Sequence, residues 1–276
     1  MKFNLEQFEG INPFHFSAKY IELDRNSPEN EFDSHVHEEC EIYVNLSGDV
    51  SFVVENTIYP VKPGDVIITR PFEYHHCVYH SDKLHKHFWI LFSSSSNEYL
   101  FNSFFEREAG NANHLSFPPE STEKIVALCH ELTKPEPLPG ERYYRFFKLI
   151  HMLHHNGIAA ETQTNYPPDV IYTLNYINCC FSQKITVSEI AKEANVSVNT
   201  LERHFKNILN ISPCEYLKKK RLANAAELLV KGCSVTDASL RSGFADYSNF
   251  ISIFKSAYGV TPLAYKKAKQ EKSTPM

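Results

Sequence analysis

The chain has 276 residues, of which 42% are hydrophobic and 22% charged, a composition typical of a soluble globular protein with about two domains. No apolar run approaches the roughly twenty residues of a transmembrane helix, and the N-terminus lacks the apolar core of a secretory signal. Seven cysteines without C-x-x-C spacing favour reduced thiols in the cytoplasm, and nine widely spaced glycines exclude the glycine-rich loops of Rossmann and P-loop nucleotide sites.

Charge is divided unevenly along the chain. Residues 1–169 carry 13 Lys or Arg against 25 Asp or Glu, whereas residues 170–276 carry 15 against 8. The net charges of the two parts are therefore −12 and +7. A basic domain joined to an acidic one points to a polyanionic partner for the basic part, although a solvated basic surface would give the same balance.

The first part of the chain predicts a β domain followed by helices. Residues 32–92 contain short β-branched and aromatic segments, such as EIYVNLS, DVIITR and HKHFWILF, separated by turn residues. Residues 97–156 change to helical periodicity, as in STEKIVALCHEL and RYYRFFKLIHMLHH. Polar sequence with prolines at 156–168 then predicts a linker, and the chain after Asp169 is expected to be helical with short breaks.

The basic half contains an internal repeat, in which residues 187–219 match residues 235–267 at an offset of 48 to 49. Phe205 matches Phe254 and Pro213 matches Pro262, both at offset 49. A repeat of this length indicates a duplicated supersecondary unit.

Capping residues divide each copy into two helices. Thr186 and Glu189 form a predicted capping box at the start of the first helix, and Ser197 is placed to cap the second. Ser234 and Asp246 occupy the equivalent positions in the second copy. Two short helices joined by a tight turn are the helix-turn-helix plan.

A long helix connects the two copies, from Ser212 to about Lys231. At 1.5 Å per residue it would span roughly 28 Å. Two recognition helices on one face of B-DNA must enter major grooves about 34 Å apart. A rigid connector of this length would let one chain occupy both grooves; the alternative is a helical bundle with a duplicated core motif.

Residues 170–268 resemble the DNA-binding domain of the AraC/XylS family of bacterial transcription regulators. The resemblance is carried by ITVSEIAKEANVS, LERHFK, SPCEYLKKKRLANAAELL and SGFADYSNFISIFKSAYGVTPLAY. It implies two helix-turn-helix units, at about 186–209 and 234–258, joined by a central helix. Ser252 stands where relatives place an arginine, so the second unit is expected to read DNA weakly and mainly to grip phosphate.

The resemblance also implies a set of DNA contacts. Asn199, Glu202 and Arg203 would face base edges, with Arg203 suited to bidentate contacts with guanine. Lys206 and Arg221 would meet phosphates, as would the capping serine of the first recognition helix. The predicted DNA-binding residues are Ser197, Asn199, Thr200, Glu202, Arg203, Lys206, Arg221, Tyr247, Ser248, Ile251, Ser252 and Lys255.

The N-terminal part resembles the cupins at two places. His35-x-His37-x₃-Glu41-x₆-Gly48 is similar to the first cupin motif, and residues 63–75 are similar to the second. The resemblance implies a small double-stranded β-helix barrel whose mouth binds a small ligand.

Two roles for this motif stay open at this point. His35, His37, Glu41 and His75 are competent ligands for Zn²⁺, Fe²⁺ or Ni²⁺, which would permit oxygenase or isomerase chemistry. Sensor domains of AraC/XylS regulators also resemble cupins, and there the same groups would hydrogen-bond a ligand. Because Glu29 stands at the usual cupin glycine, we favour a ligand site that needs no cofactor, and we expect no enzyme activity.

Aromatic rings beside a few polar groups suit a saccharide effector. Tyr74 and Phe92 are expected to contribute to the lining or core of the barrel, and His85 and His87 to lie at the surface or on strand faces. The predicted effector-binding residues are His35, His37, Glu41, Tyr43, His75 and Trp89.

The sequence therefore predicts a multi-domain transcription regulator that responds to a small molecule. An all-β cupin-like barrel at 1–96 would be followed by a helical, dimerising region at 97–160, a linker at 161–169 and an all-α DNA-binding domain at 170–276. Its expected partners are double-stranded DNA, a small-molecule effector, RNA polymerase and a second copy of the chain, with no membrane. The alternatives are a metal-dependent cupin enzyme fused to a DNA-binding tail and a regulator that needs no effector.

Overall fold

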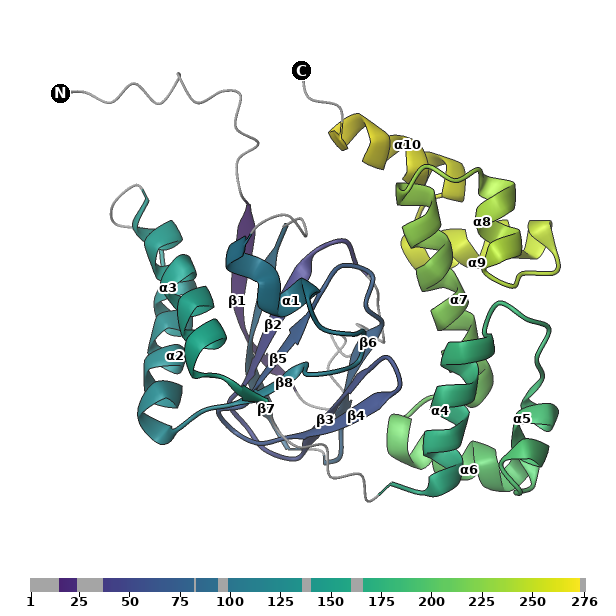
Figure 1. Ribbon diagram of the computed structural model, residues 1–276, viewed down its shortest axis with the longest axis horizontal. Coiled ribbons are helices and arrows are strands. Elements are labelled where there is room, and N and C mark those ends of the chain that lie inside the picture. Colours follow the sequence, from purple (N-terminus) through teal and green to yellow (C-terminus); the bar gives the residue numbers. More distant parts are fainter. Residues whose placement is uncertain are drawn as a thin grey trace.

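Two antiparallel sheets form the N-terminal domain of the computed structural model (Figure 1). The larger sheet has the strand order β1-β7-β2-β5-β8-β9 and the smaller has the order β4-β3-β6. The structure describes residues 15–23, 37–81, 83–93, 99–135, 140–159 and 166–273. The strands are β1 (Phe16–Leu23), β2 (Cys40–Asn45), β3 (Val50–Val54), β4 (Thr57–Val61), β5 (Val66–Thr69), β6 (His75–Tyr79), β7 (His85–Phe92), β8 (His114–Ser116) and β9 (Ile158–Ala159).

Alternation along the strands gives the larger sheet two faces of different character. Ile42 and Phe88 lie on the outer face, in a core shared with the helices that cover this sheet. Their neighbours Glu41 and Tyr43 lie on the opposite face, which looks into the barrel. We call the space between the two sheets the lumen.

Helices cover the outer face of the larger sheet (Figure 1). They are the short η3 (Tyr99–Phe101) and α1 (Asn102–Phe105) and the longer α2 (Pro119–Leu132) and α3 (Glu141–Asn156). The helical prediction for 97–160 is wrong at β8 and β9, which extend the sheet from β5. These strands have three and two residues, too few to show a period of two.

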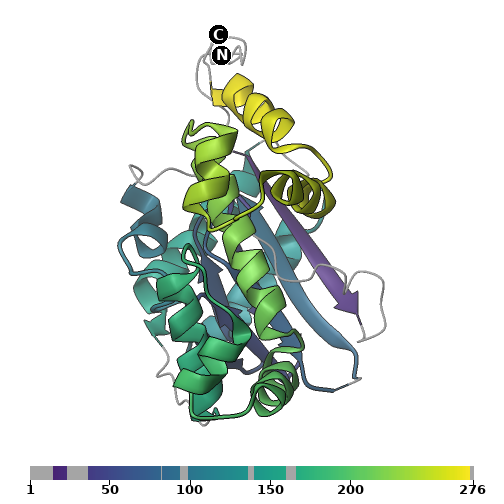
Figure 2. The ribbon, with the colours of Figure 1, turned by 90° about the vertical axis from the view of Figure 1, so that its right-hand side faces the viewer.

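The C-terminal domain is all helical, as predicted, and the connecting helix α7 runs from one unit to the other (Figure 2). The predicted capping box of Thr186 and Glu189 is complete, and Ser197, Ser234 and Asp246 each accept a hydrogen bond as N-caps. The helices are α4 (Pro168–Cys180), α5 (Val187–Glu193), α6 (Val198–Leu209), α7 (Pro213–Val230), α8 (Val235–Arg241), α9 (Tyr247–Tyr258) and α10 (Pro262–Ser273). None of the described helices is long and apolar enough to cross a membrane.

The smaller sheet lies between the lumen and the first helix-turn-helix unit. Phe52 of β3 belongs to the cluster inside the barrel, whereas Val53 packs with Leu201 and Phe205 in the core of the first unit. Tyr74 belongs to this second cluster, so the prediction that it lines or fills the barrel is wrong. Phe92 packs among the helices on the other side of the molecule, in the domain core rather than at the lumen.

Candidate functional site

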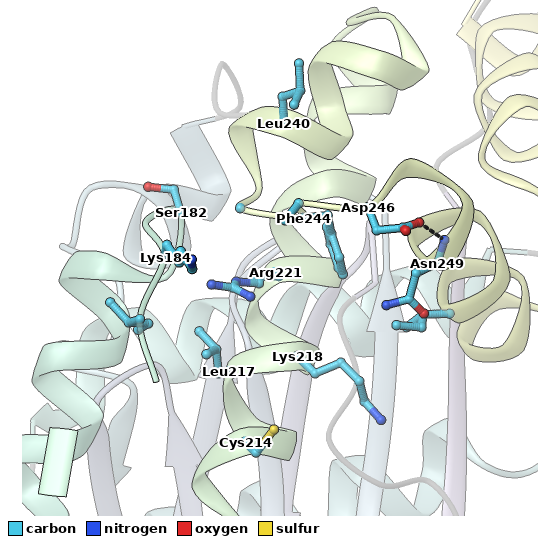
Figure 3. A pocket seen from close by; sticks show the side chains of 14 residues that line it. Ser182, Lys184, Cys214, Leu217, Lys218, Arg221, Leu240, Phe244, Asp246 and Asn249 are labelled. Atoms are coloured by element: carbon cyan, nitrogen blue, oxygen red, sulfur yellow. Dashed lines mark hydrogen bonds between the residues drawn. The ribbon is translucent and has the colours of Figure 1, made fainter. Parts of the chain in front are cut away.

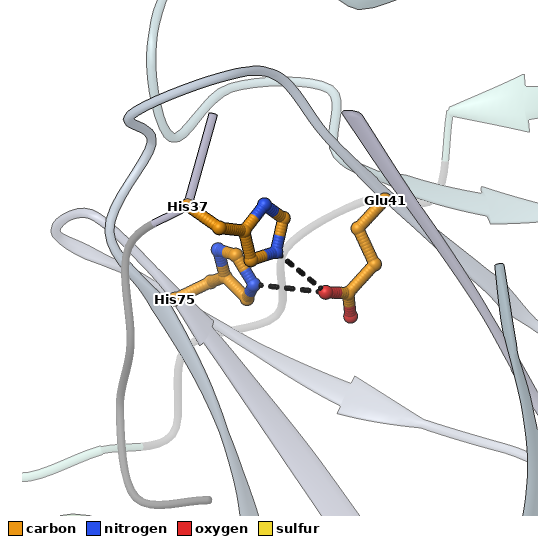
Figure 4. Close-up of side chains that lie close together, drawn as sticks. All are labelled: His37, Glu41 and His75. Atoms are coloured by element: carbon orange, nitrogen blue, oxygen red, sulfur yellow. Dashed lines mark hydrogen bonds and ion pairs between the residues drawn. The ribbon is translucent and has the colours of Figure 1, made fainter. Parts of the chain in front are cut away.

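Three predicted residues converge in the lumen on a single carboxylate oxygen (Figure 4). His37 Nε2 lies 2.9 Å from Glu41 Oε2, and His75 Nε2 lies 3.2 Å from the same oxygen. Glu41 is in β2, His37 lies three residues before that strand begins, and His75 begins β6 in the smaller sheet. Glu41 and His75 are buried, with 3% and 1% of their surface exposed. We call these three residues the lumen triad; His35, the fourth predicted member, lies outside the described residues.

Backbone carbonyls fix the orientation of both imidazoles. His37 Nδ1 donates to the carbonyl of Glu39 over 2.9 Å, and His75 Nδ1 donates to the carbonyl of Glu73 over 2.7 Å. Since each Nδ1 carries a proton, each Nε2 presents a lone pair to the carboxylate unless the ring holds a second proton. The contact of two such nitrogens with one oxygen therefore calls for a proton or a cation between them.

Electrostatics favour the charged forms of Glu41 and His75. Burial alone would raise the pKa of Glu41, but the charge of His75 and the hydrogen bonds from His37 and His75 outweigh it and hold the pKa well below its usual range. Burial alone would lower the pKa of His75, but the charge and hydrogen bond of Glu41 outweigh it, so that pKa is raised. The triad is thus a buried ion pair flanked by a second imidazole.

The triad also fits a divalent metal ion. Its ligand atoms lie within 4.8 Å of one another. Ligand atoms around four-coordinate zinc lie about 3.3 Å apart. The distances from Glu41 Oε2 to the two Nε2 atoms, 2.9 and 3.2 Å, are close to this value. Metal-bound histidines usually donate their second nitrogen to a carbonyl or carboxylate, as both histidines do here. Imidazole nitrogens with one carboxylate suit zinc, iron or nickel.

Aromatic side chains continue the lumen beyond the triad. The Tyr43 ring stacks on His87 at 4.7 Å and contacts Phe52 of the opposite sheet at 4.9 Å. Trp89 is the cross-strand partner of Tyr43, so it lies on the same face of the sheet, and it is partly exposed. The lumen therefore brings together His37, Glu41, Tyr43, His75 and Trp89 of the predicted effector-binding set.

His87 is a residue of this site that the sequence did not reveal. The sequence predicts His87 at the surface or on a strand face, and it lies on the lumen face of β7, 5% exposed and stacked on Tyr43. His85 of the same strand is buried as well. The strand HKHFWILF is buried on both faces, so its hydrophobic pattern does not distinguish them. Among the described residues, His87 Nδ1 has no hydrogen-bond partner although it is buried, which leaves it available to a ligand.

We expect His87 to make the protein less stable in mild acid. Burial lowers the pKa of His87 to about 4, from a usual value of 6.5. Between these values the unfolded chain binds a proton that the folded chain does not, so the free energy of unfolding falls as the pH is lowered. His87→Phe should reduce this loss in urea unfolding measured between about pH 7 and about pH 4.5, which covers most of the interval between the two pKa values. His151→Phe on the exposed side of α3 is the control, and an unchanged pH dependence in His87→Phe would contradict the assignment.

A buried network supports the loop that carries His75. The Glu73 carboxylate, whose side chain is fully buried, accepts two hydrogen bonds from Arg107 at 2.7 and 2.5 Å. It also accepts one from the Gly110 amide at 2.8 Å and one from Asn113 at 3.1 Å. Glu73 thus ties the loop before β6 to the segment after α1. Neither Glu73 nor Arg107 was singled out in the sequence.

The predicted DNA contacts of the two recognition helices lie on the exposed surface. In α6, Asn199, Glu202, Arg203 and Lys206 are exposed, opposite the buried Phe205. In α9 the predicted residues Tyr247, Ser248, Ser252 and Lys255 are exposed, and Ile251 is half-buried. Ser197 is exposed, and its hydroxyl is bonded to that of the half-buried Thr200 at 2.8 Å. Their contacts with DNA stay predictions.

A hollow of about 540 Å³ separates the two units on the side of α7 that faces away from the barrel (Figures 1 and 3). Lys184, Lys218 and Arg221 line it together with Asn249 from α9. Arg221 donates to the carbonyls of Phe181 at 2.7 Å and Gln183 at 2.8 Å, so most of its guanidinium holds the turn after α4. Fewer of its N–H groups are therefore available for the predicted phosphate contact. Lys184 and Lys218 are exposed cations beside it that the sequence prediction did not include.

Two family models match the chain. One, described as an AraC-like ligand binding domain, matches residues 21–155, and the other, described as a helix-turn-helix domain, matches residues 190–268. Together they cover about three quarters of the sequence.

The chain is similar to curated transcription regulators over most of its length. The uncharacterized HTH-type transcriptional regulator YdeC of Bacillus subtilis is 27% identical, over 84% of this chain and 85% of the relative. The HTH-type transcriptional activator RhaS of Klebsiella pneumoniae is 24% identical, over 88% of this chain and 90% of the relative. Among solved structures, the C-terminal domain of AraT, a response regulator from Geobacillus stearothermophilus, is 34% identical over 38% of this chain and 88% of that chain, with a TM-score of 0.37.

Proposed function

Because the chain belongs to the AraC family of DNA-binding transcription regulators, with a ligand-binding domain followed by a helix-turn-helix domain, we propose that a small molecule in the lumen controls how the C-terminal domain engages DNA. The position of the lumen supports this proposal. A single three-stranded sheet separates the lumen cluster from the core of the first helix-turn-helix unit. A ligand that favours one conformation of this sheet would therefore bias the unit packed on it.

We propose a saccharide as the effector. The rings of Tyr43 and Trp89 offer apolar faces, and His37, Glu41 and His87 offer hydrogen-bonding groups around them. Such a mixture of stacking surfaces and a few polar groups suits a sugar ring.

A thermal-shift panel of monosaccharides tests the effector class. One sugar should raise the melting temperature in proportion to the logarithm of its concentration once the concentration exceeds its dissociation constant. Trp89→Ala should abolish this shift at a small cost in stability, because the side chain is only partly buried. Tyr172→Ala, which removes a partly exposed ring from α4, is the control. Equal shifts in the parent and in Trp89→Ala would contradict a lumen site, and a panel without any shift would contradict the saccharide.

The remaining partners are proposals that follow from the family. Double-stranded DNA would lie across the recognition helices α6 and α9, and RNA polymerase would be contacted at the promoter. A homodimer would form through the helices on the outer face of the larger sheet, where Tyr144 is 66% exposed. We assign the barrel a sensing role and no catalytic one.

A second candidate role for the lumen triad is to hold a divalent metal. The observation that favours it is the orientation of His37 and His75, whose Nδ1 atoms are tied to carbonyls while both Nε2 atoms point to Glu41. A bound ion would supply a Lewis-acidic centre for oxygen atoms of the effector.

Metal analysis of the purified chain tests this second role. The metal hypothesis predicts about one equivalent of zinc, iron or nickel per chain, lost in His75→Ala and in Glu41→Gln. His155→Ala, on the exposed end of α3, should retain it. Chain that is purified without chelator and carries no metal, and that takes up none in a titration with zinc, would contradict this role and leave hydrogen bonding as the function of the triad.

A further inference from the structure

The barrel touches both helix-turn-helix units, and the contacts lie close to the lumen triad in the sequence. Polar contacts at Ser51 and Asn56 join the smaller sheet to Tyr166 and Asn175, at 3.2 and 2.6 Å. Two stronger connections, each centred on one glutamate of the barrel, reach the helices α7 and α10. The inference below rests on the proposed function, since it concerns how the lumen acts on the DNA-binding domain.

The first connection, which we call the α7 clamp, joins Glu55 to α7. The Tyr216 hydroxyl donates to the carbonyl of Glu55, and the Lys220 ammonium forms an ion pair with its carboxylate. Glu55 in turn exchanges two hydrogen bonds with Tyr74: its Oε1 accepts from the Tyr74 amide at 2.9 Å, and its own amide donates to the Tyr74 carbonyl at 2.8 Å. The Tyr74 ring meets the Tyr216 ring edge to face at 5.0 Å. Tyr74 directly precedes His75 of the lumen triad.

Glu55 lies in the two-residue turn between β3 and β4 and is buried beside α7. Glu55 has φ = 51° at the turn between β3 and β4, a conformation that is unfavourable for a glutamate. It is also 7% exposed, so its carboxylate is desolvated, and a paired cation offsets the cost of that burial. Lys220 supplies that cation from a residue 165 positions away.

The second connection, the α10 clamp, joins Glu38 to the last helix. Its Oε1 accepts a hydrogen bond from the Tyr265 hydroxyl at 2.9 Å and lies 2.9 Å from the Lys269 ammonium. The Tyr265 ring packs on Phe254 at 5.5 Å, which fixes α10 to the core of the second unit. Glu38 directly follows His37 of the lumen triad.

We propose that the occupant of the lumen triad sets the relative orientation of the two helix-turn-helix units through these clamps. His75 is adjacent to the α7 clamp, which holds the first unit, and His37 is adjacent to the α10 clamp, which holds the second. Both histidines contact Glu41 Oε2, at 2.9 and 3.2 Å, and their rings meet edge to face at 5.0 Å. A ligand that replaces Glu41 as their common partner changes the separation of the two histidines. A shift of His75 moves the α7 clamp and the first unit, and a shift of His37 moves the α10 clamp and the second unit.

The clamps fix the orientation of the two helix-turn-helix units and do not cover the DNA-binding surface of the protein. Residues 216 and 220 lie on the side of α7 that faces the barrel, while Lys218 and Arg221 line the hollow on its other side. Arg203 on α6 and Ser248 on α9 stay exposed with both clamps closed. What the clamps can change is the angle and spacing of α6 and α9, which must fit successive major grooves of DNA.

A thermodynamic cycle on the full-length chain tests this coupling. The DNA is a duplex carrying the site that the chain itself selects from random sequence. Glu41→Gln perturbs the triad, and Glu38→Gln with Glu55→Gln opens both clamps without removing any charge from the DNA-binding domain. Glu22→Gln with Glu120→Gln, at two exposed glutamates of the barrel domain, is the charge-matched control. Melting temperatures verify that each variant is folded.

We expect Glu41→Gln to change the dissociation constant for DNA by about fivefold or more in the parent and in the control background. With the clamps open, Glu41→Gln should change the dissociation constant for DNA by less than about twofold. Glu38→Gln alone, at a partly exposed residue, should already make the change caused by Glu41→Gln smaller. An equal change with clamps open and closed would overturn the coupling, as would a parent chain in which Glu41→Gln has no effect. A chain that selects no DNA site would instead overturn the proposed function, and the coupling with it.

Discussion

Replacing Arg107 by alanine is expected to lower the free energy of unfolding by about 3–5 kcal/mol, the usual cost of removing one partner from a buried ion pair. Arg107 is 7% exposed and Glu73 is fully buried, so the substitution leaves a carboxylate in the protein interior with two of its hydrogen bonds gone. Burial alone would raise the pKa of Glu73, and it is mainly Arg107 that outweighs burial and lowers it. Chemical denaturation followed by circular dichroism measures the loss.

A matched pair of variants separates charge burial from simple loss of contacts. Glu73→Gln added to Arg107→Ala should restore part of the stability, because a neutral amide is less costly to bury. Lys124→Ala, which breaks an exposed ion pair with Glu120, should change stability far less, because solvent screens the pair. If Arg107→Ala cost no more than Lys124→Ala, the network around Glu73 would not support the loop that carries His75.

Replacing Arg203 by alanine is expected to weaken binding to the selected DNA site by about 1–3 kcal/mol, which is roughly 5- to 150-fold. Arg203 is exposed on α6, on the side opposite the buried Leu201 and Phe205, where a guanidinium can reach the edge of a guanine. Because the contact is to a base, the loss should be largest for the preferred sequence and small for unrelated DNA. Preference should relax at one base pair.

Lys206→Ala is the contrasting variant on the same helix. Lys206 is exposed one turn further along α6, where it would meet phosphate rather than a base edge. It should weaken binding to all sequences alike and reduce the salt dependence of the affinity by about one phosphate contact. Binding measured on the preferred and on a scrambled duplex at several salt concentrations separates the two effects. An Arg203→Ala variant with unchanged sequence preference would contradict the assignment of the reading face.

Sequence alone was sufficient for the C-terminal domain because its signals are local and repeated. The caps Ser197 and Asp246 mark where the recognition helices begin, and both accept the expected hydrogen bonds. The core positions Phe205 and Phe254, aligned by the internal repeat, are both fully buried. Each cap depends on residues within about four positions of one another, and the repeat shows each core position twice in one sequence.

The lumen was predictable only where a spaced motif marks it. His37, Glu41 and His75 meet as that motif implies. His87 did not stand out, because β7 is buried on both of its faces.

Long-range partners explain the other omissions. The residues Glu73 and Arg107 are 34 positions apart, and Glu55 and Lys220 are 165 positions apart. No period or spacing in a single sequence links such pairs. Strand β1 begins before the predicted strand region, and it is placed by pairing with β7 and by packing of Phe16 on Phe146 of α3.

The central prediction is that α7 holds the recognition helices α6 and α9 one helical turn of DNA apart on one chain. Hydroxyl-radical footprinting of the full-length protein on its selected site tests it most directly. We predict two protected blocks per protomer on the same face of the duplex, with centres about ten base pairs apart. One protected block per protomer, or two blocks on opposite faces of the duplex, would contradict this arrangement.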